Sequence, residues 1–107
     1  MDRLNRIDML LAMLEKEPDD LFLNYALGTE YVGELDLGQA EFQFKKVLKL
    51  DPEYIAAYYQ LGKLFESVLK NTEALEFYRL GLEKAKLGKN NKAINEFGEA
   101  IFMLEDS

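Results

Sequence analysis

The sequence contains neither cysteine nor histidine among its 107 residues. Without cysteine the chain can form neither a disulfide framework nor a thiolate nucleophile. Without histidine it lacks the side chain that proteins use most often as a general base and as a metal ligand. Prolines are also scarce, with only Pro18 and Pro52 interrupting the chain. Because long helices are therefore permitted almost everywhere, these absences favour a helical fold without a redox or metal centre.

Long apolar segments are missing as well. The longest apolar run near the N-terminus covers residues 9–14, which is shorter than the apolar core of a secretory signal, and acidic residues surround it. We therefore expect no signal peptide, no membrane-spanning helix and a cytoplasmic protein. The formal net charge is −7, and such a chain is repelled by phosphate backbones and anionic lipids. No nucleic-acid or membrane partner is expected.

What the sequence does contain is an internal repeat with a period of about 34 residues. Under this shift Pro18 falls on Pro52, and residues of one class fall on residues of the same class along the chain. The matching pairs are Leu14 with Leu48, Leu27-Gly28 with Leu61-Gly62, Tyr31 with Phe65, Ala40 with Ala74, Phe44 with Tyr78, and Leu48 with Leu82. Small and aromatic residues each recur in their own class, which coincidence does not explain.

This period, with its order of Leu-Gly, aromatic, alanine, aromatic and proline, resembles the tetratricopeptide repeat (TPR) family. The first repeat, residues 21–54, has Asn24 where an aromatic residue is usual and Val47 where alanine is usual. The second repeat, residues 55–88, has Lys86 in place of the closing proline. Since lysine can continue a helix that proline would end, we expect the last helix of that repeat to run on.

The resemblance implies an all-α fold of antiparallel helical hairpins, stacked as a short right-handed solenoid in one domain, residues 1–107. Residues 1–18 act as an N-terminal half-repeat, and residues 89–107 as a C-terminal capping helix that overlaps a degenerate third repeat. In that third repeat the helix at 72–87 serves twice, and the signature residues are Phe77, Leu80, Gly81, Gly88, Ala93, Phe97 and Ala100. The six expected helices cover about residues 2–16, 20–33, 37–50, 54–67, 71–87 and 90–104.

Several local features accompany this interpretation. Gly28 is expected to face Ala40, and Gly62 to face Ala74, because two helices approach closely only where side chains are small. Gly88 is expected to end a helix in the left-handed conformation. Asn90 or Asn91 then caps the start of the last helix.

No residue pattern predicts catalysis. The adjacent acids Asp19 and Asp20 follow Pro18 at a helix start, where carboxylates cap backbone amides. Glu30 and Glu34 form an exposed helical pair. No stretch matches a phosphate loop, a calcium loop or a zinc motif, so we expect no enzyme, no cofactor and no metal.

The helix dipole explains a run of basic residues. Lys45, Lys46 and Lys49 lie in the last turns of a predicted helix. Cations are favoured there by the partial negative charge of the helix C-terminus.

The function expected from the resemblance is non-catalytic protein–protein interaction. In the family, the first helices of successive repeats line a concave groove that takes peptides. The positions that match this groove are Phe22, Tyr25 and Thr29 in the first repeat, and Tyr59, Lys63 and Glu66 in the second. The alternative for the aromatic residues among them is that they only pack against neighbouring helices.

Two further expectations concern the partner. Some family members grip the terminal carboxylate of chaperones with lysine and asparagine, but Tyr25, Thr29 and Gln60 stand at the corresponding positions, so this ligand is not expected. The expected partner is a protein or peptide of unknown identity. The alternative function is a self-associating module, a weak homodimer formed through the groove or the capping helices.

Overall fold

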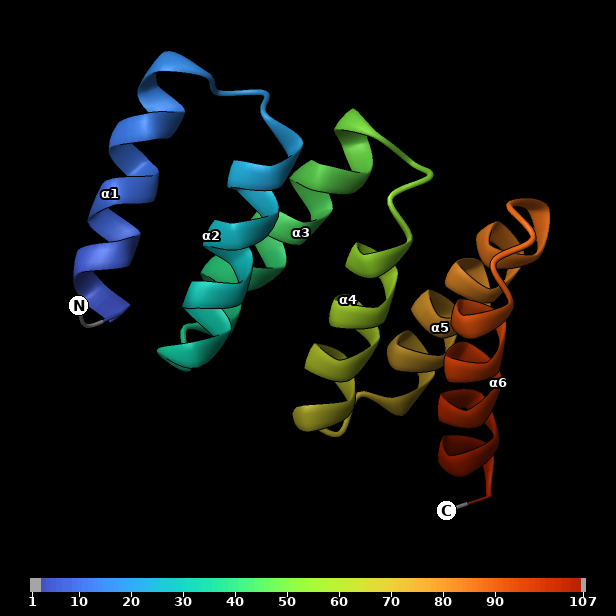
Figure 1. Ribbon diagram of the computed structural model, residues 1–107. Coiled ribbons are helices and arrows are strands. Elements are labelled where there is room, and N and C mark those ends of the chain that lie inside the picture. Colours follow the sequence, from blue (N-terminus) through green and yellow to red (C-terminus); the bar gives the residue numbers. More distant parts are fainter. Residues whose placement is uncertain (1–2, 107) are drawn as a thin grey trace. The chain divides into compact units, whose positions relative to one another are not determined.

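The computed structural model describes residues 3–106, and over these residues the secondary structure is six α-helices and no strand (Figure 1). The helices are α1 (Arg3–Lys16), α2 (Leu21–Gly33), α3 (Leu37–Leu50), α4 (Ile55–Ser67), α5 (Asn71–Leu87) and α6 (Asn91–Glu105). The predicted start of the first helix, at residue 2, lies outside the described residues, and every other end lies within one residue of its predicted position. The predicted all-α class is confirmed.

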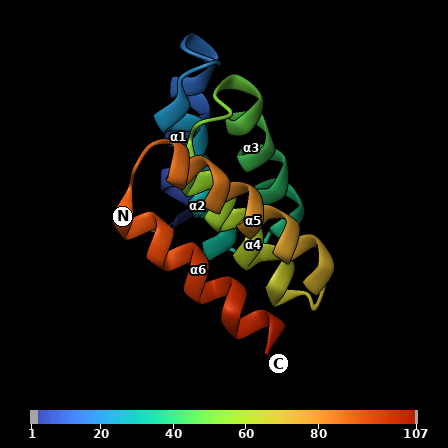
Figure 2. The ribbon, with the colours of Figure 1, turned by 90° about the vertical axis from the view of Figure 1, so that its right-hand side faces the viewer.

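The helices form two compact units, which divide after Pro52. The N-terminal unit contains α1 to α3, with α2 packed against both of its neighbours. The C-terminal unit contains α4 to α6, with α5 packed against α4 and α6. Figure 2 shows α5 and α6 running side by side in opposite directions, as expected for a helical hairpin. The predicted hairpins of antiparallel helices are confirmed within each unit.

The helix ends follow from residues that the sequence singles out. Helix α1 ends before Pro18 and α3 ends before Pro52. Helix α5 has 17 residues against 14 in α3, and Lys86 lies within its last turn, so the predicted extension is confirmed. The side chain of Asp20 caps α2 by accepting a hydrogen bond from the amide of Leu23 at 2.8 Å.

Three turns of the same design connect α2 to α3, α4 to α5 and α5 to α6. The middle residues of these turns, Leu35, Leu69 and Lys89, have φ values of 60°, 62° and 54°. In each turn the next amide donates to a carbonyl five residues earlier, for example Lys70 N to Phe65 O at 2.9 Å. These bonds satisfy carbonyl groups that the helix end leaves without partners.

The expectation for Gly88 was therefore wrong. Gly88 keeps a right-handed conformation, with φ −84°, and the left-handed residue is Lys89. Gly88 directly precedes Lys89 and has a right-handed conformation that any residue can adopt. Asn90 does cap α6, because its Oδ1 accepts from the amide of Ala93 at 3.1 Å. Of the two predicted caps, Asn90 is thus the one used.

Replacing Leu69 by glycine is expected to stabilise the protein. The left-handed conformation costs an ordinary L-residue roughly 1–2 kcal/mol and costs glycine almost nothing. The leucine side chain is 85% exposed and loses little packing. After subtraction of glycine's extra freedom in the unfolded chain, Leu69→Gly should raise the free energy of unfolding by about 0.5–1 kcal/mol. Chemical denaturation measures this change.

The matched control is Val68→Gly, one residue earlier in the same turn. Val68 has a φ of −106°, which valine adopts without strain. Glycine there adds freedom to the unfolded chain and also removes the packing of a side chain that is 43% exposed, so it should destabilise the protein. Equal losses of stability in both variants would show that the positive φ of Leu69 stores no strain.

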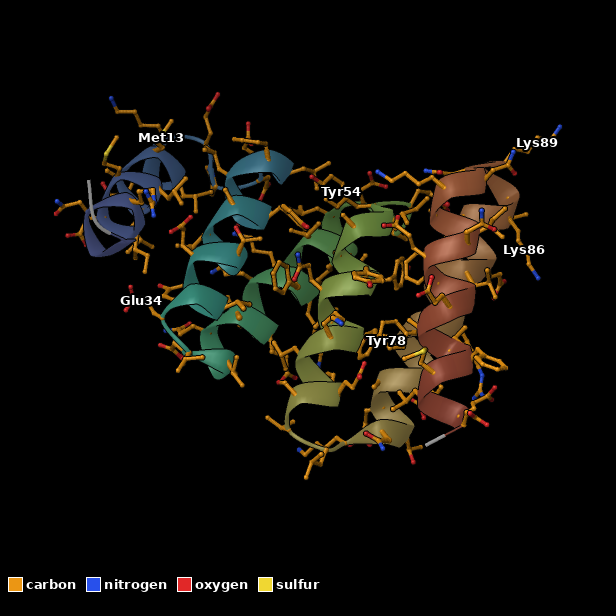
Figure 3. All side chains as sticks on the ribbon, turned by 60° about the horizontal axis from the view of Figure 1, so that its bottom comes forward. Met13, Glu34, Tyr54, Tyr78, Lys86 and Lys89 are labelled. Atoms are coloured by element: carbon orange, nitrogen blue, oxygen red, sulfur yellow. The ribbon has the colours of Figure 1, made fainter. Side chains whose placement is uncertain are left out.

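Close approaches between helices recur with the same spacing along the sequence. A Cβ atom added to Gly28 would lie 2.6 Å from the ring of Phe44, one on Gly62 would lie 2.3 Å from the ring of Tyr78, and one on Gly81 would lie 2.4 Å from the ring of Phe97. All three rings are buried, and Figure 3 labels Tyr78, which lies among the helices of the C-terminal unit. The atoms nearest to these glycines are therefore those of aromatic rings. The expectation that Gly28 faces Ala40 and Gly62 faces Ala74 did not include these rings.

Candidate functional site

A groove on the C-terminal unit gathers the predicted site residues of the second repeat. It has a volume of about 320 Å³ and lies between α4 and α6. Its lining residues are Tyr59, Lys63 and Glu66 from α4, and Glu96, Glu99, Ala100 and Met103 from α6. Positions 59, 63 and 66 share one helical face because they are separated by four and three residues. The structure thus brings Tyr59, Lys63 and Glu66 together.

Tyr59 forms the aromatic wall of this groove and also packs inward. Its ring centroid lies 5.8 Å from that of Tyr78 and 5.6 Å from that of Phe97. The side chain is half-buried, so one part of the ring contacts the core and the other part lines the groove. The ammonium group of Lys63 lies 5.9 Å from the centroid of the Tyr59 ring, within the range of a cation–π contact. The exposed face of this ring therefore already attracts a cation.

Glu66 is held in place by a buried tyrosine. The hydroxyl of Tyr78 donates to Glu66 Oε1 at 2.8 Å. Burial of Tyr78, together with its hydrogen bond to the negative Glu66, raises the pKa of the tyrosine hydroxyl above its ordinary value. Tyr78 therefore keeps its proton at neutral pH and remains a hydrogen-bond donor. This hydrogen bond fixes the Glu66 carboxylate at the groove.

The groove has an acidic balance. Glu66, Glu96 and Glu99 supply three carboxylates against the single ammonium group of Lys63. Both glutamates on α6 are exposed, so they are available to a ligand and are screened by salt. A segment that carries positive charge is favoured here over one that carries negative charge.

Sequence reasoning did not identify the four groove residues on α6. The repeat shift locates groove positions only on α2 and α4, and α6 resembles the second helix of a hairpin through Ala93, Phe97 and Ala100. The usable signal was the spacing from Gly81 to Phe97, which equals that of the other glycine–aromatic pairs. The contact between Gly81 and Phe97 packs α6 against α5. The contact of Phe97 with Tyr59 then places α6 beside the side of α4 that lines the groove.

The predicted residues of the first repeat lie on one face of α2, in the N-terminal unit. Phe22 is 71% exposed. Tyr25 is half-buried, with its ring centroid 5.5 Å from that of Phe44. The hydroxyl of Thr29 donates to the carbonyl of Ala26 at 2.7 Å. The buried part of the Tyr25 side chain thus packs against the core, as the buried part of Tyr59 does. Phe22, by contrast, is exposed to solvent.

Residues 3–106 were also considered for a metal site and for a membrane-spanning helix, and neither feature is present in them. No group of three or more aspartate or glutamate side chains is arranged to hold a metal ion in this part of the chain. Within the same residues, none of the helices combines the length and the apolar character needed to cross a bilayer.

Comparison with solved structures identifies the fold. A crystal structure of a tetratricopeptide repeat domain protein from Salinibacter ruber is 31% identical, with 81% of this chain and 97% of that chain covered and a TM-score of 0.75. A solution structure of a tetratricopeptide repeat domain protein from the same organism is also 31% identical, covers 83% of this chain and 90% of that one, and has a TM-score of 0.79. The TPR2B domain of yeast Sti1, solved as a complex with pHsp70, matches over 98% of this chain and 84% of that one at 17% identity and a TM-score of 0.89.

Other comparisons gave no match. The sequence matches no protein-family model. It also matches no curated protein. The two Salinibacter structures nevertheless combine more than 30% identity with nearly complete coverage of their own chains. Together with the repeat period and the recurring glycine–aromatic contacts, this likeness shows that the chain belongs to the tetratricopeptide repeat family.

Proposed function

We propose that the chain is a non-catalytic protein-interaction module and that the groove between α4 and α6 receives a segment of its partner. The observation that carries this proposal is the joint lining of the groove by Tyr59 and by carboxylates from both helices. An aromatic side chain on rigid helices offers contact area at little cost in conformational entropy. The Sti1 domain, which has the same fold, was solved as a complex with pHsp70, which supports binding of this general kind.

The charges of the groove define the partner more closely. Glu66, Glu96 and Glu99 favour lysine or arginine side chains, and the face of Tyr59 offers a second favourable contact to the same cations. The predicted absence of a lysine–asparagine clamp agrees with this preference, because a clamp of that kind serves a carboxylate. The partner segment that fits is a basic one.

Selection of displayed random peptides on the intact chain tests the proposal. We expect the enriched peptides to carry lysine or arginine and to bind less tightly as salt concentration rises. Glu99→Lys should weaken the selected peptides about tenfold, which corresponds to roughly 1.4 kcal/mol. Fluorescence anisotropy of labelled peptides measures the dissociation constants.

A matched variant controls for net charge. Glu15→Lys makes the same change in charge at an exposed residue of α1, which is not among the groove residues, and should leave the affinity nearly unchanged. Circular dichroism spectra confirm that both variants remain helical. If the selected peptides bound Glu99→Lys as tightly as they bind the unchanged chain, the groove would not be their site.

A further inference from the structure

A second hollow lies on the N-terminal unit and takes no part in the function proposed above. It has a volume of about 720 Å³, more than twice that of the groove on the C-terminal unit. Its lining residues are Asp19, Gly38, Glu41, Phe42, Lys45, Lys46, Lys49 and Leu50. We call five of these residues, namely Phe42, Lys45, Lys46, Lys49 and Leu50, the α3 patch.

The α3 patch combines exposed apolar side chains with a rim of lysines. Phe42 is 63% exposed and Leu50 is 39% exposed. Residues 42, 45, 46 and 49 follow the three- and four-residue spacing of one helical face. The aliphatic stems of the lysines extend the apolar floor while their ammonium groups stay in water. Within a chain of net charge −7, the three lysines of this hollow outnumber its two acids, Asp19 and Glu41, so the hollow keeps a net positive charge.

The helix dipole explains only part of this arrangement. Lys49 does lie in the last turn of α3, as predicted. Lys45, however, is ion-paired with Glu41 at 2.6 Å, and Lys46 donates to the carbonyl of Pro18 at 2.9 Å. Neither contact uses the carbonyl end of α3, and the dipole gives no reason for Phe42 to be exposed. An exposed aromatic residue within an apolar hollow is typical of an interaction surface.

The occupant that fits the α3 patch has apolar side chains followed by carboxylates. The chain itself carries this pattern at the end of α6, where Phe102 and Met103 are 66% and 65% exposed. Glu105 and Asp106 follow directly and are also exposed. We call these four residues the α6 end. In both helices the aromatic residue comes first and the charges begin three residues later, with opposite sign.

We propose that the α6 end of one copy of the chain docks on the α3 patch of a second copy. Packed in parallel, the two helices would place Phe102 near Phe42 and the carboxylates near the lysines. Glu105 already pairs with Arg79 in its own chain. Because an ion pair between exposed groups is worth only about 0–1 kcal/mol, it does not prevent a contact with a second copy.

The predicted contact is heterologous, because the two surfaces differ. Each copy would therefore keep one free surface of each kind after pairing, and association would continue into rings or open chains of copies. The interface is small and copies of like net charge repel one another, so we expect weak association, with a dissociation constant on the order of 100 µM at physiological salt.

Two complementary variants of the full chain test this proposal. The acceptor variant, Phe42→Ser with Lys49→Glu, alters only the α3 patch. The donor variant, Phe102→Ser with Asp106→Ser, alters only the α6 end. All four residues are exposed, so circular dichroism should show unchanged helicity. Sedimentation velocity over about 10 µM to 1 mM should show concentration-dependent assembly of the unchanged chain and at least tenfold weaker assembly of either variant alone.

The decisive sample is a 1:1 mixture of the two variants. The acceptor variant keeps a working α6 end and the donor variant keeps a working α3 patch, so the mixture should form complexes of two copies and nothing larger. The control is Phe22→Ser with Lys92→Glu, a similar change at exposed residues outside both surfaces, which should assemble like the unchanged chain.

Three results would overturn the proposal. The first is an unchanged chain that stays a single copy across the whole concentration range, which would leave the α3 patch to a segment of another protein. The second is assembly that survives in the acceptor variant. The third is assembly that is lost in the control with Phe22→Ser and Lys92→Glu, which would place self-association on a surface other than the α3 patch and the α6 end. None of these variants alters a residue of the α4–α6 groove. Because Met103 belongs both to the α6 end and to the groove lining, peptide binding is measured below about 10 µM, where the chain is a single copy, and there it stands or falls separately.

Discussion

Gly62→Val is expected to destabilise the C-terminal unit by about 3 kcal/mol, near the upper end of the usual cost of overpacking. A Cβ atom on residue 62 would lie 2.3 Å from the ring of Tyr78. That ring is completely buried and its hydroxyl is hydrogen-bonded to Glu66, so the ring cannot swing away without losing both the packing and the bond. Thermal unfolding should show a melting temperature lowered by more than about 10 °C.

Gly98→Val is the matched control. Gly98 also lies within a helix, but an added Cβ atom there would have no heavy atom within 4 Å. The intrinsic helix propensities of glycine and valine differ by only a few tenths of a kcal/mol, so the stability should change by less than about 0.5 kcal/mol. Similar losses at positions 62 and 98 would mean that the contact with Tyr78 does not limit what residue 62 can be.

Much of the fold was predictable because residues within the repeat mark where its helices end. The shift that brings Pro18 onto Pro52 placed all six helices, and these two prolines, together with Lys86, marked where helices end or continue. The local contacts were harder to predict. A small residue shows that something approaches closely, but it does not show what approaches. Gly62 could have faced Ala74 or Tyr78, and only the rotation of the two helices about their axes decides between them.

The turns and the groove show two further limits of sequence reasoning. A left-handed residue is predicted from glycine, yet Leu35, Leu69 and Lys89 hold that conformation. The hydrogen bonds of the turn, and not the residue type, select it. On the groove, Tyr59, Lys63 and Glu66 were predictable from the first helix of a repeat. Glu96, Glu99 and Met103 were not predictable. Helix α6 has the sequence pattern of the second helix of a hairpin, but it lines the groove as a first helix does.

Asn24 stands where the family usually has an aromatic residue, and the structure gives a reason. Its side chain is fully buried. Its amide nitrogen donates to the carbonyl of Pro18 at 3.0 Å and to that of Asp20 at 2.8 Å. The side chain thereby ties the loop between α1 and α2 to the second helix. The neighbouring oxygens are acceptors, so only a donor can replace the amide nitrogen without loss.

Asn24→Asp, which keeps the shape of the side chain, is therefore expected to cost about 3–5 kcal/mol at pH 7, the usual effect of a buried charge without a partner. Burial and the facing carbonyl oxygens both disfavour the ionised form, so the pKa of the introduced carboxyl should rise above its unfolded value of about 4. A raised pKa in the folded state means that the unfolded state loses its proton first. Below pH 4 the penalty should therefore fall to the loss of one of the two hydrogen bonds, because a protonated carboxyl has a single O–H donor. Above pH 4 it should grow, by up to about 1.4 kcal/mol per pH unit, until the folded-state pKa is passed.

Urea denaturation of the variant and of the unchanged chain at several pH values between 4 and 8 measures this difference. Taking the difference at each pH removes the titration of all the other carboxylates, which both proteins share. Asn95→Asp on the exposed face of α6 makes the same chemical change in water, and its difference should stay near zero across the range. A penalty at Asn24 that did not vary with pH would show that the introduced carboxyl remains ionised or finds a donor, and that the two carbonyls of Pro18 and Asp20 do not determine which residue can occupy this position.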